Sequence, residues 1–536
     1  MDTKTGYSPV LTRNISLKSP IVTTYLASKC YVPSLYAVIF ISLICLYRIY
    51  FHPLSKYPGP ILAKVTNLYA GYHAWRGDVH TDILKCHERY GKVIRYSPER
   101  LLFNTAESVS DIYSHRSNVL KSKVYHALSA QAPNSLTLRD KALHGKRRRV
   151  ISQAFSENTL RSFEPKVIEK IHQLSDTMVE VPQETDKSSR EWSDSKDMGH
   201  CFDHLTFDIM TDVLFSARFN TIGDLKYRYA MTAIEESNVR LGVLVQAPEL
   251  RRRKLQPLLF PQALKARYMF AMFIRKVLGE RLKPSKEDRK DVFSFVQQAK
   301  DPDTGNSLDI TELSTETATL IIAGSDTTST SMAATLHYLS FSPLAYRKAA
   351  EEVRRCFTNL EEIRMGPLLN SCTGSAKIPE ALRMSPPGGG PLWREVYKGG
   401  ALINGMHIQE GVDVAVGIHS IHHNPEYFPE PYRYNPDRWL KTINGTEELK
   451  KMRSAYMPFG LGPRSCVGKP LALVELMLTM ATFLWQFDFR ASNRDEVAWA
   501  DGTMAAEQFH LKDHVTGQKD GPLIEFRLRD LSGNWE

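Results

Sequence analysis

The chain has 536 residues, of which 42% are hydrophobic and 24% charged, a composition typical of a globular protein and not of a collagen-like or wholly disordered one. Its net charge of +10 is spread along the sequence, and no basic run is interleaved with aromatic residues, so nucleic acid is not an expected partner. The seven cysteines include no C-x-x-C pair, which argues against a zinc site or a thioredoxin-like redox pair. Scattered cysteines in so long a chain also predict no disulfide framework and a reducing compartment.

An uncharged apolar run, VPSLYAVIFISLICLY, fills residues 32–47. It is slightly shorter than the ~20 residues that cross a bilayer core, but tyrosines flank it as interfacial aromatic residues would. We expect an N-terminal tail over 1–30, with a glycosylation sequon at Asn14, and a transmembrane signal-anchor over 31–50. A cleaved signal peptide and a buried core helix are the alternatives. Three prolines then predict a stiff neck over 51–60.

Residues 61–536 are expected to form one domain in which helices dominate and a small sheet completes an α+β, mainly α, architecture. Residues 92–104 read as two short strands around a Ser-Pro-Glu turn. The apolar residues of Met198–Phe215 recur at the spacing of one helical face. After Gly400, short alternating runs with glycine turns indicate a small sheet, and a last helix is expected over about 467–487.

One cysteine, Cys466, lies in a sequence context that requires a chemical explanation: PFGLGPRSCVGKP over residues 458–470. The glycines at 460 and 462 permit a tight loop whose backbone N–H groups can approach the sulfur. The following helix places its positive N-terminal end beside Cys466, which favours the thiolate form that a metal ion such as iron requires. A buried cysteine at a helix N-cap is the alternative, but it does not account for the whole pattern.

The same residues resemble the haem-binding signature of the cytochrome P-450 family, Phe-Gly-x-Gly-x-Arg-x-Cys-x-Gly, which is matched at every fixed position from Phe459 to Gly468. The resemblance implies the large helical haem-thiolate fold and haem b, with Cys466 as the axial ligand of the iron. It also implies that Phe459, Gly460, Arg464 and Gly468 contribute to haem binding. Arg464 is the expected partner of a haem propionate.

A second segment, LIIAGSDTT over residues 320–328, is an apolar helix that suddenly carries an acid and several hydroxyls. Such residues are poor in a helix interior because their side chains compete for backbone hydrogen bonds. A helix N-cap would explain them, but apolar helix precedes them and further helix follows. We therefore expect a local break that forms a groove for dioxygen, with Gly324 allowing close approach. In this interpretation, which resembles the family's acid–alcohol pair, Thr327 hydrogen-bonds dioxygen and Asp326 relays protons.

Glu380 and Arg383 stand at i and i+3, within pairing distance on one helix face. In isolation such a pair is commonplace at a surface, but the resemblance implies that both join Arg438 in a structural network that fixes the loop before the cysteine. The preceding segment departs from the family, because TGSAKIP over residues 373–379 places a proline directly before the glutamate. The helix therefore either starts unusually late, at Pro379, or is kinked there, or the gene model contains a local error.

Family members usually show Trp-x-x-x-Arg in a helix near the haem edge, and His144 and Arg148 occupy that place here. As i and i+4 they share a helix face, so both are candidate partners of the haem propionates, with a solvated basic face as the alternative. Substrate contacts are expected from residues 114–136, 246–270 and 386–392, and the glycines of the last segment would enlarge the space above the haem. No buried charge stands out there, so the expected substrate is sizeable and mostly apolar.

No flavin or nicotinamide fingerprint occurs in the sequence, so electrons are expected from a separate NADPH-cytochrome P-450 reductase, with cytochrome b5 as a further candidate partner. The segments Tyr50–Pro60 and Pro386–Val396 are similar to those of filamentous-fungal members that act in secondary metabolism. We therefore expect a monooxygenase, single-pass in the endoplasmic reticulum membrane and facing the cytosol, that oxidises a terpenoid, polyketide or alkaloid by hydroxylation, epoxidation or several steps. A haem-thiolate isomerase or dehydratase and a membrane haem sensor are the competing hypotheses, but neither needs a proton relay.

Overall fold

In the computed structural model of the chain, the described residues are 34–129, 132–179, 191–252, 254–283, 291–298, 305, 307–374, 377–492 and 508–530. The chain divides into two units, Met1–Lys56 and Tyr57–Glu536. In the first, one helix over Ser34–Phe51 is long and apolar enough to cross a membrane, and none of that span is buried. This helix covers most of the expected anchor over 31–50, whereas Asn14 lies outside the described residues.

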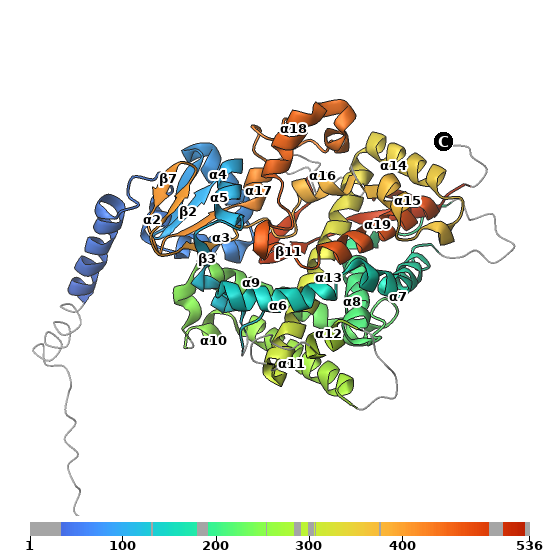
Figure 1. Ribbon diagram of the computed structural model, residues 1–536, viewed down its shortest axis with the longest axis horizontal. Coiled ribbons are helices and arrows are strands. Elements are labelled where there is room, and N and C mark those ends of the chain that lie inside the picture. The colour runs from blue at the N-terminus through green and yellow to red at the C-terminus, as the bar shows by residue number, and fades with distance from the viewer. Residues whose placement is uncertain are drawn as a thin grey trace, which may run out of the picture. The chain divides into compact units, whose positions relative to one another are not determined.

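Helices make up most of the second unit, so the prediction of a mainly α architecture with small sheets is confirmed (Figure 1). The predicted helix over Met198–Phe215 is α8, and the helix expected after the cysteine is α19, Lys469–Gln486. The other helices are α2 (Ile61–Val65), α3 (Leu68–Arg76), α4 (Val79–Tyr90), α5 (Ala106–Tyr113), α6 (Lys141–Gln153), α7 (Glu157–Ser175), α9 (Tyr229–Gln246), α10 (Gln256–Leu259), α11 (Pro261–Arg281), α12 (Val292–Gln298), α13 (Ile310–Phe341), α14 (Pro343–Cys356), α15 (Pro367–Leu369), α16 (Lys377–Met384), α17 (Ile418–His422) and α18 (Lys441–Ala455).

The long helix α13 runs through the middle of this unit and packs against α8, α16 and α19 (Figure 1). It begins at a capping box in which Asp309 and Glu312 each accept a backbone N–H of the other. The break expected within 320–328 is wrong, because α13 continues through these residues. The Thr327 hydroxyl is accommodated in the helix because it donates to the carbonyl of Ala323, one turn back, at 2.7 Å.

A five-stranded sheet of order β1-β2-β8-β5-β3 lies at one end of the unit, beside α4 and α5 (Figure 1). The first two strands form the hairpin predicted over 92–104, and β8 joins it in parallel. Because β3 pairs with β5, Lys121 lies opposite Arg394 although the two are far apart in sequence. The strands are β1 (Val93–Ser97), β2 (Arg100–Phe103), β3 (Val119–Lys121), β5 (Arg394–Val396) and β8 (Asp413–Val416).

Three smaller sheets complete the unit. The sheet structure expected after Gly400 is confirmed, because β6 and β7 form a hairpin there and β8 follows. A second hairpin, β10–β11, lies close to the C-terminal end of the chain. The strands are β4 (Lys196–Asp197), β6 (Ala401–Ile403), β7 (Met406–Ile408), β9 (Phe487–Ala491), β10 (Leu511–His514), β11 (Thr516–Lys519) and β12 (Leu523–Leu528).

No disulfide framework is expected from the sequence, but one pair of cysteines is bonded. Cys356, the last residue of α14, is bonded to Cys372 in the π-helical turn η7, Asn370–Gly374. The two are 16 residues apart in sequence, but the intervening turns bring their Cα atoms to 6.5 Å, a distance that a disulfide spans. Cysteine usage therefore no longer argues for a reducing compartment.

The irregular segment before Glu380 is resolved by a short helix. The described part of α16 runs from Lys377 to Met384, so it starts two residues before Pro379. The expectation that the helix starts at Pro379 is therefore wrong, because two described helical residues precede the proline.

Candidate functional site

The cysteine loop is a tight turn that depends on two glycines. The N–H of Cys466 donates to the carbonyl of Phe459 at 2.8 Å and closes the loop. Gly460 and Gly462 have φ of 66° and 68°, in the left-handed region that other residues disfavour. At Gly462 there is also no room for a side chain, because a Cβ would lie 2.0 Å from the carbonyl oxygen of Tyr113. The loop is therefore held directly against the end of α5.

The sulfur of Cys466 lies at the start of α19. Burial raises the pKa of the Cys466 thiol, whereas the backbone N–H groups of Gly468 and Lys469 and the charge of Arg148 act in the opposite direction. The side chain keeps solvent-accessible surface although protein atoms surround it on most sides. This combination is expected of a sulfur that faces an internal cavity. The donor set, one thiol with N–H groups directed at it, fits the axial ligand of a haem iron.

The other two signature residues lie beside the sulfur. The ring of Phe459 is half-buried and packs against the hydrophobic core, with the Nζ of Lys469 5.5 Å from its centre. A Cβ at Gly468 would lie 3.9 Å from the sulfur of Cys466, in ordinary van der Waals contact. Phe459 thus shields one side of the loop, and Gly468 keeps the start of α19 close to the sulfur.

Five basic side chains, Lys121, His144, Arg148, Arg394 and Arg464, converge near the cysteine loop. Three of them, Lys121, His144 and Arg394, are buried, and the two others are half-buried. Burial, together with the charges of the other four, lowers the pKa of His144 to about 3. Burial and the charges of Arg394 and Arg464 also hold the pKa of Lys121 well below its ordinary value. The cluster is therefore strongly electropositive.

The cluster has too little negative charge of its own. Asp140 acts on Arg464, but within the described parts of the chain none of the five forms an ion pair with a carboxylate. Buried like charges without counter-ions are costly. The cluster therefore fits a ligand with two negative charges, such as the propionates of haem. Sequence reasoning missed Lys121 and Arg394, because they meet only through the pairing of β3 with β5.

Two of the predicted propionate partners also hold the loop itself. Arg148 donates to the carbonyl of Ser465 at 2.5 Å and to its hydroxyl at 3.2 Å. Arg464 donates to the carbonyls of Leu138 and, at 3.0 Å, Arg139. Both guanidiniums thus connect the cysteine loop to α6 and to the segment before it. Their contact with haem propionates stays a prediction.

The adjacent residues Asp326 and Thr327 contact different surroundings. The Thr327 hydroxyl donates to the carbonyl of Ala323 within α13. Ala323 is exposed and Thr327 half-buried, whereas most of the helix is buried. Asp326 is buried, and its Oδ2 accepts hydrogen bonds from Nδ2 of Asn238 at 3.2 Å and from the hydroxyl of Thr516. Burial raises the pKa of Asp326 to about 6, against the opposing charge of Lys519. An acid that titrates near neutral pH therefore lies directly behind a hydroxyl.

Three glycines predicted to serve the oxygen or substrate site, Gly324, Gly389 and Gly390, are closely packed against other parts of the protein. A Cβ at Gly324 would lie 2.3 Å from Cε of Met210, so this glycine admits a side chain of α8. A Cβ at Gly389 would lie 3.2 Å from Cβ of His80, and one at Gly390 would lie 3.0 Å from a carboxylate oxygen of Asp513. The expectation that the 386–392 glycines enlarge the cavity is therefore wrong at these two positions.

The three residues of the expected structural network are brought together in the core. Glu380 accepts from Nε of Arg383 at 3.0 Å and from Nε of Arg438 at 2.9 Å, and all three side chains are buried. Arg383 also donates to the carbonyl of His422, whose Nε2 accepts the N–H of Met457 at 2.9 Å. The network thus reaches the residue that precedes the Pro458–Phe459 start of the cysteine loop.

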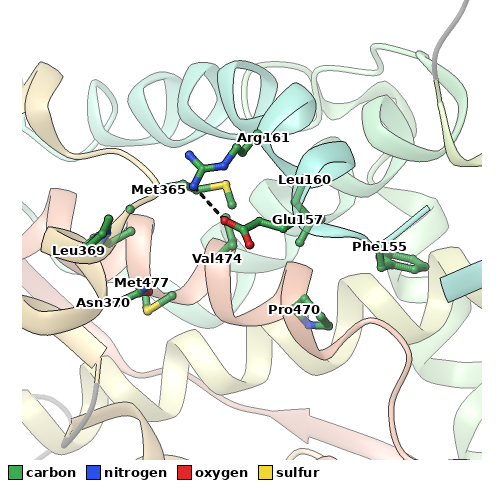
Figure 2. Close-up of a pocket in the computed structure, with 12 residues that line it drawn as sticks. Phe155, Glu157, Leu160, Arg161, Met365, Leu369, Asn370, Pro470, Val474 and Met477 are labelled. Atoms are coloured by element: carbon green, nitrogen blue, oxygen red, sulfur yellow. Dashed lines mark hydrogen bonds and ion pairs between the residues drawn. The ribbon is translucent and has the colours of Figure 1, made fainter. Parts of the chain in front are cut away.

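A surface hollow of about 450 Å³ lies beside the first turns of α19 (Figure 2). Its apolar lining includes Leu160, Val474 and Met477, and the ion pair between Arg161 and Glu157 of α7, at 2.9 Å, lies along one side of it. The helices α7, α15 and α19 contribute the lining. Because α19 begins three residues after Cys466, the hollow lies beside the start of the helix that follows the cysteine loop.

Comparison with known proteins agrees with this geometry. The sequence model of the family described as Cytochrome P-450 matches residues 56–511. The chain belongs to the cytochrome P-450 family. It is 49% identical to the cytochrome P-450 monooxygenase poxM of Penicillium oxalicum over 90% of this chain and 91% of that protein. It is 41% identical to atnE of Emericella nidulans over 92% and 96% of the two chains, and 52% identical to lcsN of Purpureocillium lilacinum over 62% and 99%.

The match extends over the fold and the cysteine loop together. The chain is therefore a monooxygenase, an oxidoreductase that incorporates oxygen from dioxygen, with a haem-thiolate cofactor. As in the family generally, it acts on a small molecule and takes electrons from a redox partner. The apolar helix over Ser34–Phe51 fits a membrane anchor of the kind found in this family.

Proposed function

We propose that this cytochrome P-450 inserts one oxygen atom into a mostly apolar compound of fungal secondary metabolism by hydroxylation, epoxidation or successive oxidations. A terpenoid, polyketide or alkaloid is the proposed substrate class. The observation that carries the proposal is the combination of an accessible Cys466 thiol, at which backbone N–H groups are directed, with a largely buried cationic cluster beside it. Haem b bound there supplies the iron that activates dioxygen, and its thiolate ligand favours cleavage of the O–O bond.

The residues of the chain then have separate tasks. Arg148 and Arg464 hold the cysteine loop and, with His144, bind the propionates. Thr327 offers a hydroxyl on the exposed side of α13, where dioxygen is expected, and Asp326 supplies protons behind it. Glu380 and its two arginines are structural and keep the loop in place.

A spectrum and a turnover assay test this function. The purified, reduced protein with carbon monoxide is expected to show the red-shifted Soret band of a thiolate-ligated haem. Product formation is expected to require NADPH and a separate reductase. Absence of the band would contradict the haem-thiolate site. Turnover without reductase would favour the alternative activity, that of a haem-thiolate isomerase or dehydratase.

Thr327→Ala is expected to uncouple the enzyme. Without the hydroxyl, proton delivery to dioxygen is impaired, so the product formed per NADPH falls roughly 10-fold or more and hydrogen peroxide rises. The assay compares product, peroxide and NADPH with an apolar surrogate substrate that shifts the haem spectrum. Thr335→Ala is the matched control, because its buried hydroxyl makes the same bond one turn back, to Ser331 at 2.7 Å. A well-coupled Thr327→Ala enzyme would refute the role of this residue.

We also propose that the electron donor is the NADPH-cytochrome P-450 reductase, with cytochrome b5 as a second donor, at the face that carries the hollow of Figure 2. Support comes from exposed basic residues there, Lys469 at the start of α19 and Arg161 on the rim. An acidic partner surface would be attracted to them.

Lys469→Glu is expected to slow haem reduction by the reductase about 10-fold at low ionic strength, because charge reversal removes electrostatic steering. Stopped-flow reduction at several salt concentrations measures the effect, which should fade as salt increases. Lys512→Glu, a reversal at an exposed lysine of β10, is the control. Equal rates for both variants would contradict this docking face.

The location proposed for the enzyme is the endoplasmic reticulum membrane, with a single pass and the catalytic domain in the cytosol. The helix over Ser34–Phe51 supports the anchor. In this orientation the N-terminal tail is lumenal and Asn14 is available for glycosylation.

A further inference from the structure

A buried lysine on the C-terminal hairpin connects two helices behind the candidate oxygen site. The Lys519 side chain is 1% exposed, and its Nζ donates to Oδ1 of Asp203 in α8 at 2.5 Å and to the hydroxyl of Ser329 in α13 at 3.0 Å. Ser329 in turn donates to the same carboxylate at 2.6 Å. Lys519, Asp203 and Ser329 therefore form one closed hydrogen-bonded group.

The same hairpin contacts Asp326 directly. Thr516, at the start of β11, donates its hydroxyl to Oδ2 of Asp326, and Asn238 of α9 donates to both, at 2.7 Å to Thr516 and 3.2 Å to Asp326. Thr330 of α13 donates to the carbonyl of Gly517 at 2.9 Å. Three of these hydrogen bonds, from Thr516 to Asp326, from Asn238 to Thr516 and from Thr330 to Gly517, involve β11 and hold it beside Asp326.

The tip of the hairpin is strained and tightly enclosed. Val515 has φ of 84°, a conformation that a β-branched residue rarely adopts and that persists only where the surroundings enforce it. A Cβ at Gly242 of α9 would lie 3.4 Å from the backbone of His514, and the N–H of Gly517 donates to the carbonyl of Pro387 at 2.6 Å. The hairpin is therefore fixed in place, and with it Lys519.

The charges around Lys519 are unequal. Three carboxylates, Asp203, Glu235 and Asp326, lie close enough for their charges to act on this one cation. Burial raises the pKa of Glu235, which is half-buried on α9, to about 7, and the Asp203 charge adds to the rise. His200, also acting on Glu235, is largely exposed and hydrogen-bonded to Asp197. A second acid with a raised pKa and an exposed histidine therefore lie near the Asp203–Lys519 pair.

We propose that Lys519 is a positioning residue for proton supply: held by Asp203 and Ser329 on the hairpin that contacts Asp326, it sets the protonation of the Asp326 carboxyl, and protons reach that carboxyl from the side of Asp203 and Glu235. The proposal rests on the proposed acid–alcohol role of Asp326 and Thr327. Monooxygenation converts substrate, dioxygen, two electrons and two protons into oxygenated product and water. The electrons come from NADPH through the reductase, and the protons leave Asp326 and are replaced from the Asp203–Glu235 side.

Infrared titration of the haem-loaded, full-length protein tests the proposal without a substrate. The protonated carboxyl of Asp326 gives a C=O band that Asp326→Asn should remove, and its titration midpoint is measured against pH. Because the cation of Lys519 favours the charged carboxylate, Lys519→Gln should raise the midpoint by about one pH unit or more. Asp203→Asn removes a negative charge and should lower it.

Two variants control for general disturbance of the hairpin. Lys519→Arg keeps the cation and should retain the wild-type midpoint, and Lys512→Gln changes an exposed lysine on the paired strand β10. A midpoint that moves equally in Lys519→Gln and Lys512→Gln, or that moves upward in Asp203→Asn, would overturn the proposal. So would the absence of any band that Asp326→Asn removes.

Peroxide yield separates this proposal from the function on which it rests. If Asp326→Asn and Thr327→Ala uncouple the enzyme but Lys519→Gln has the pH profile of wild type, the role of Lys519 is refuted and the acid–alcohol pair stands. If neither Asp326→Asn nor Thr327→Ala changes coupling, the acid–alcohol pair is refuted and the proton-supply role falls with it.

Discussion

Cys466→Ala is expected to abolish the red-shifted carbon-monoxide band and to reduce turnover by more than about 100-fold. Mutation of a residue that only hydrogen-bonds a metal ligand already costs about 10–100-fold in metal affinity or activity, and loss of the ligand itself should cost more. The sulfur is the atom to which the N–H groups of Gly468 and Lys469 point, and its side chain is solvent-exposed. Alanine leaves the backbone bond from residue 466 to Phe459 in place, so the loop should keep its shape. Spectra, haem content and turnover are the measurements.

The matched control is Cys201→Ala, because Cys201 is a free, half-buried cysteine of α8 and lies outside the cysteine loop. It should keep the band and the turnover of the parent enzyme. A Cys466→Ala protein that retains the thiolate-type band would show that another residue ligates the iron. Retained haem without the band is compatible with the proposal, because the cationic cluster still binds the propionates.

The features of the site that were predictable from sequence are those contained in one short segment. The loop from Phe459 to Gly468 is encoded by its own glycines, and only the reason for Gly462, the carbonyl of Tyr113, needed the structure. The break in α13 was predicted wrongly for a local reason. Hydroxyls can end a helix or donate one turn back, and sequence does not say which, whereas Thr327 does the latter.

The residues that sequence did not reveal reach the site through long-range pairing. Lys121 and Arg394 meet across β3 and β5, and Lys519 reaches Asp203 from a hairpin 316 residues later in the chain. The disulfide between Cys356 and Cys372 likewise depends on how two turns fold back. No periodicity or spacing reports such contacts, because they are decided by tertiary packing.

Glu380→Gln is expected to cost about 3–5 kcal/mol of unfolding free energy, the range for breaking a buried ion pair by removing one partner. Glu380 is fully buried and accepts five hydrogen bonds, from both Nε and an NH2 group of Arg383, Nε of Arg438, the backbone N–H of Asn435 and Nε1 of Trp439. Glutamine keeps the shape but removes the negative charge that faces these two buried guanidiniums. Denaturant unfolding measures the change, and Glu447→Gln, in an exposed pair with Lys450, should show none that can be resolved.

The pH dependence of this loss identifies the charge as its cause. Burial alone would raise the pKa of Glu380, but Arg383 and Arg438 outweigh it and hold the pKa below its ordinary value. A depressed carboxyl pKa contributes stability that is present above the unfolded-state value and is lost as the pH falls through the folded-state value. The difference between the parent protein and Glu380→Gln should therefore shrink in acid. A difference that is constant with pH, or a variant as stable as the parent at neutral pH, would mean that packing and not charge holds the segment before Cys466.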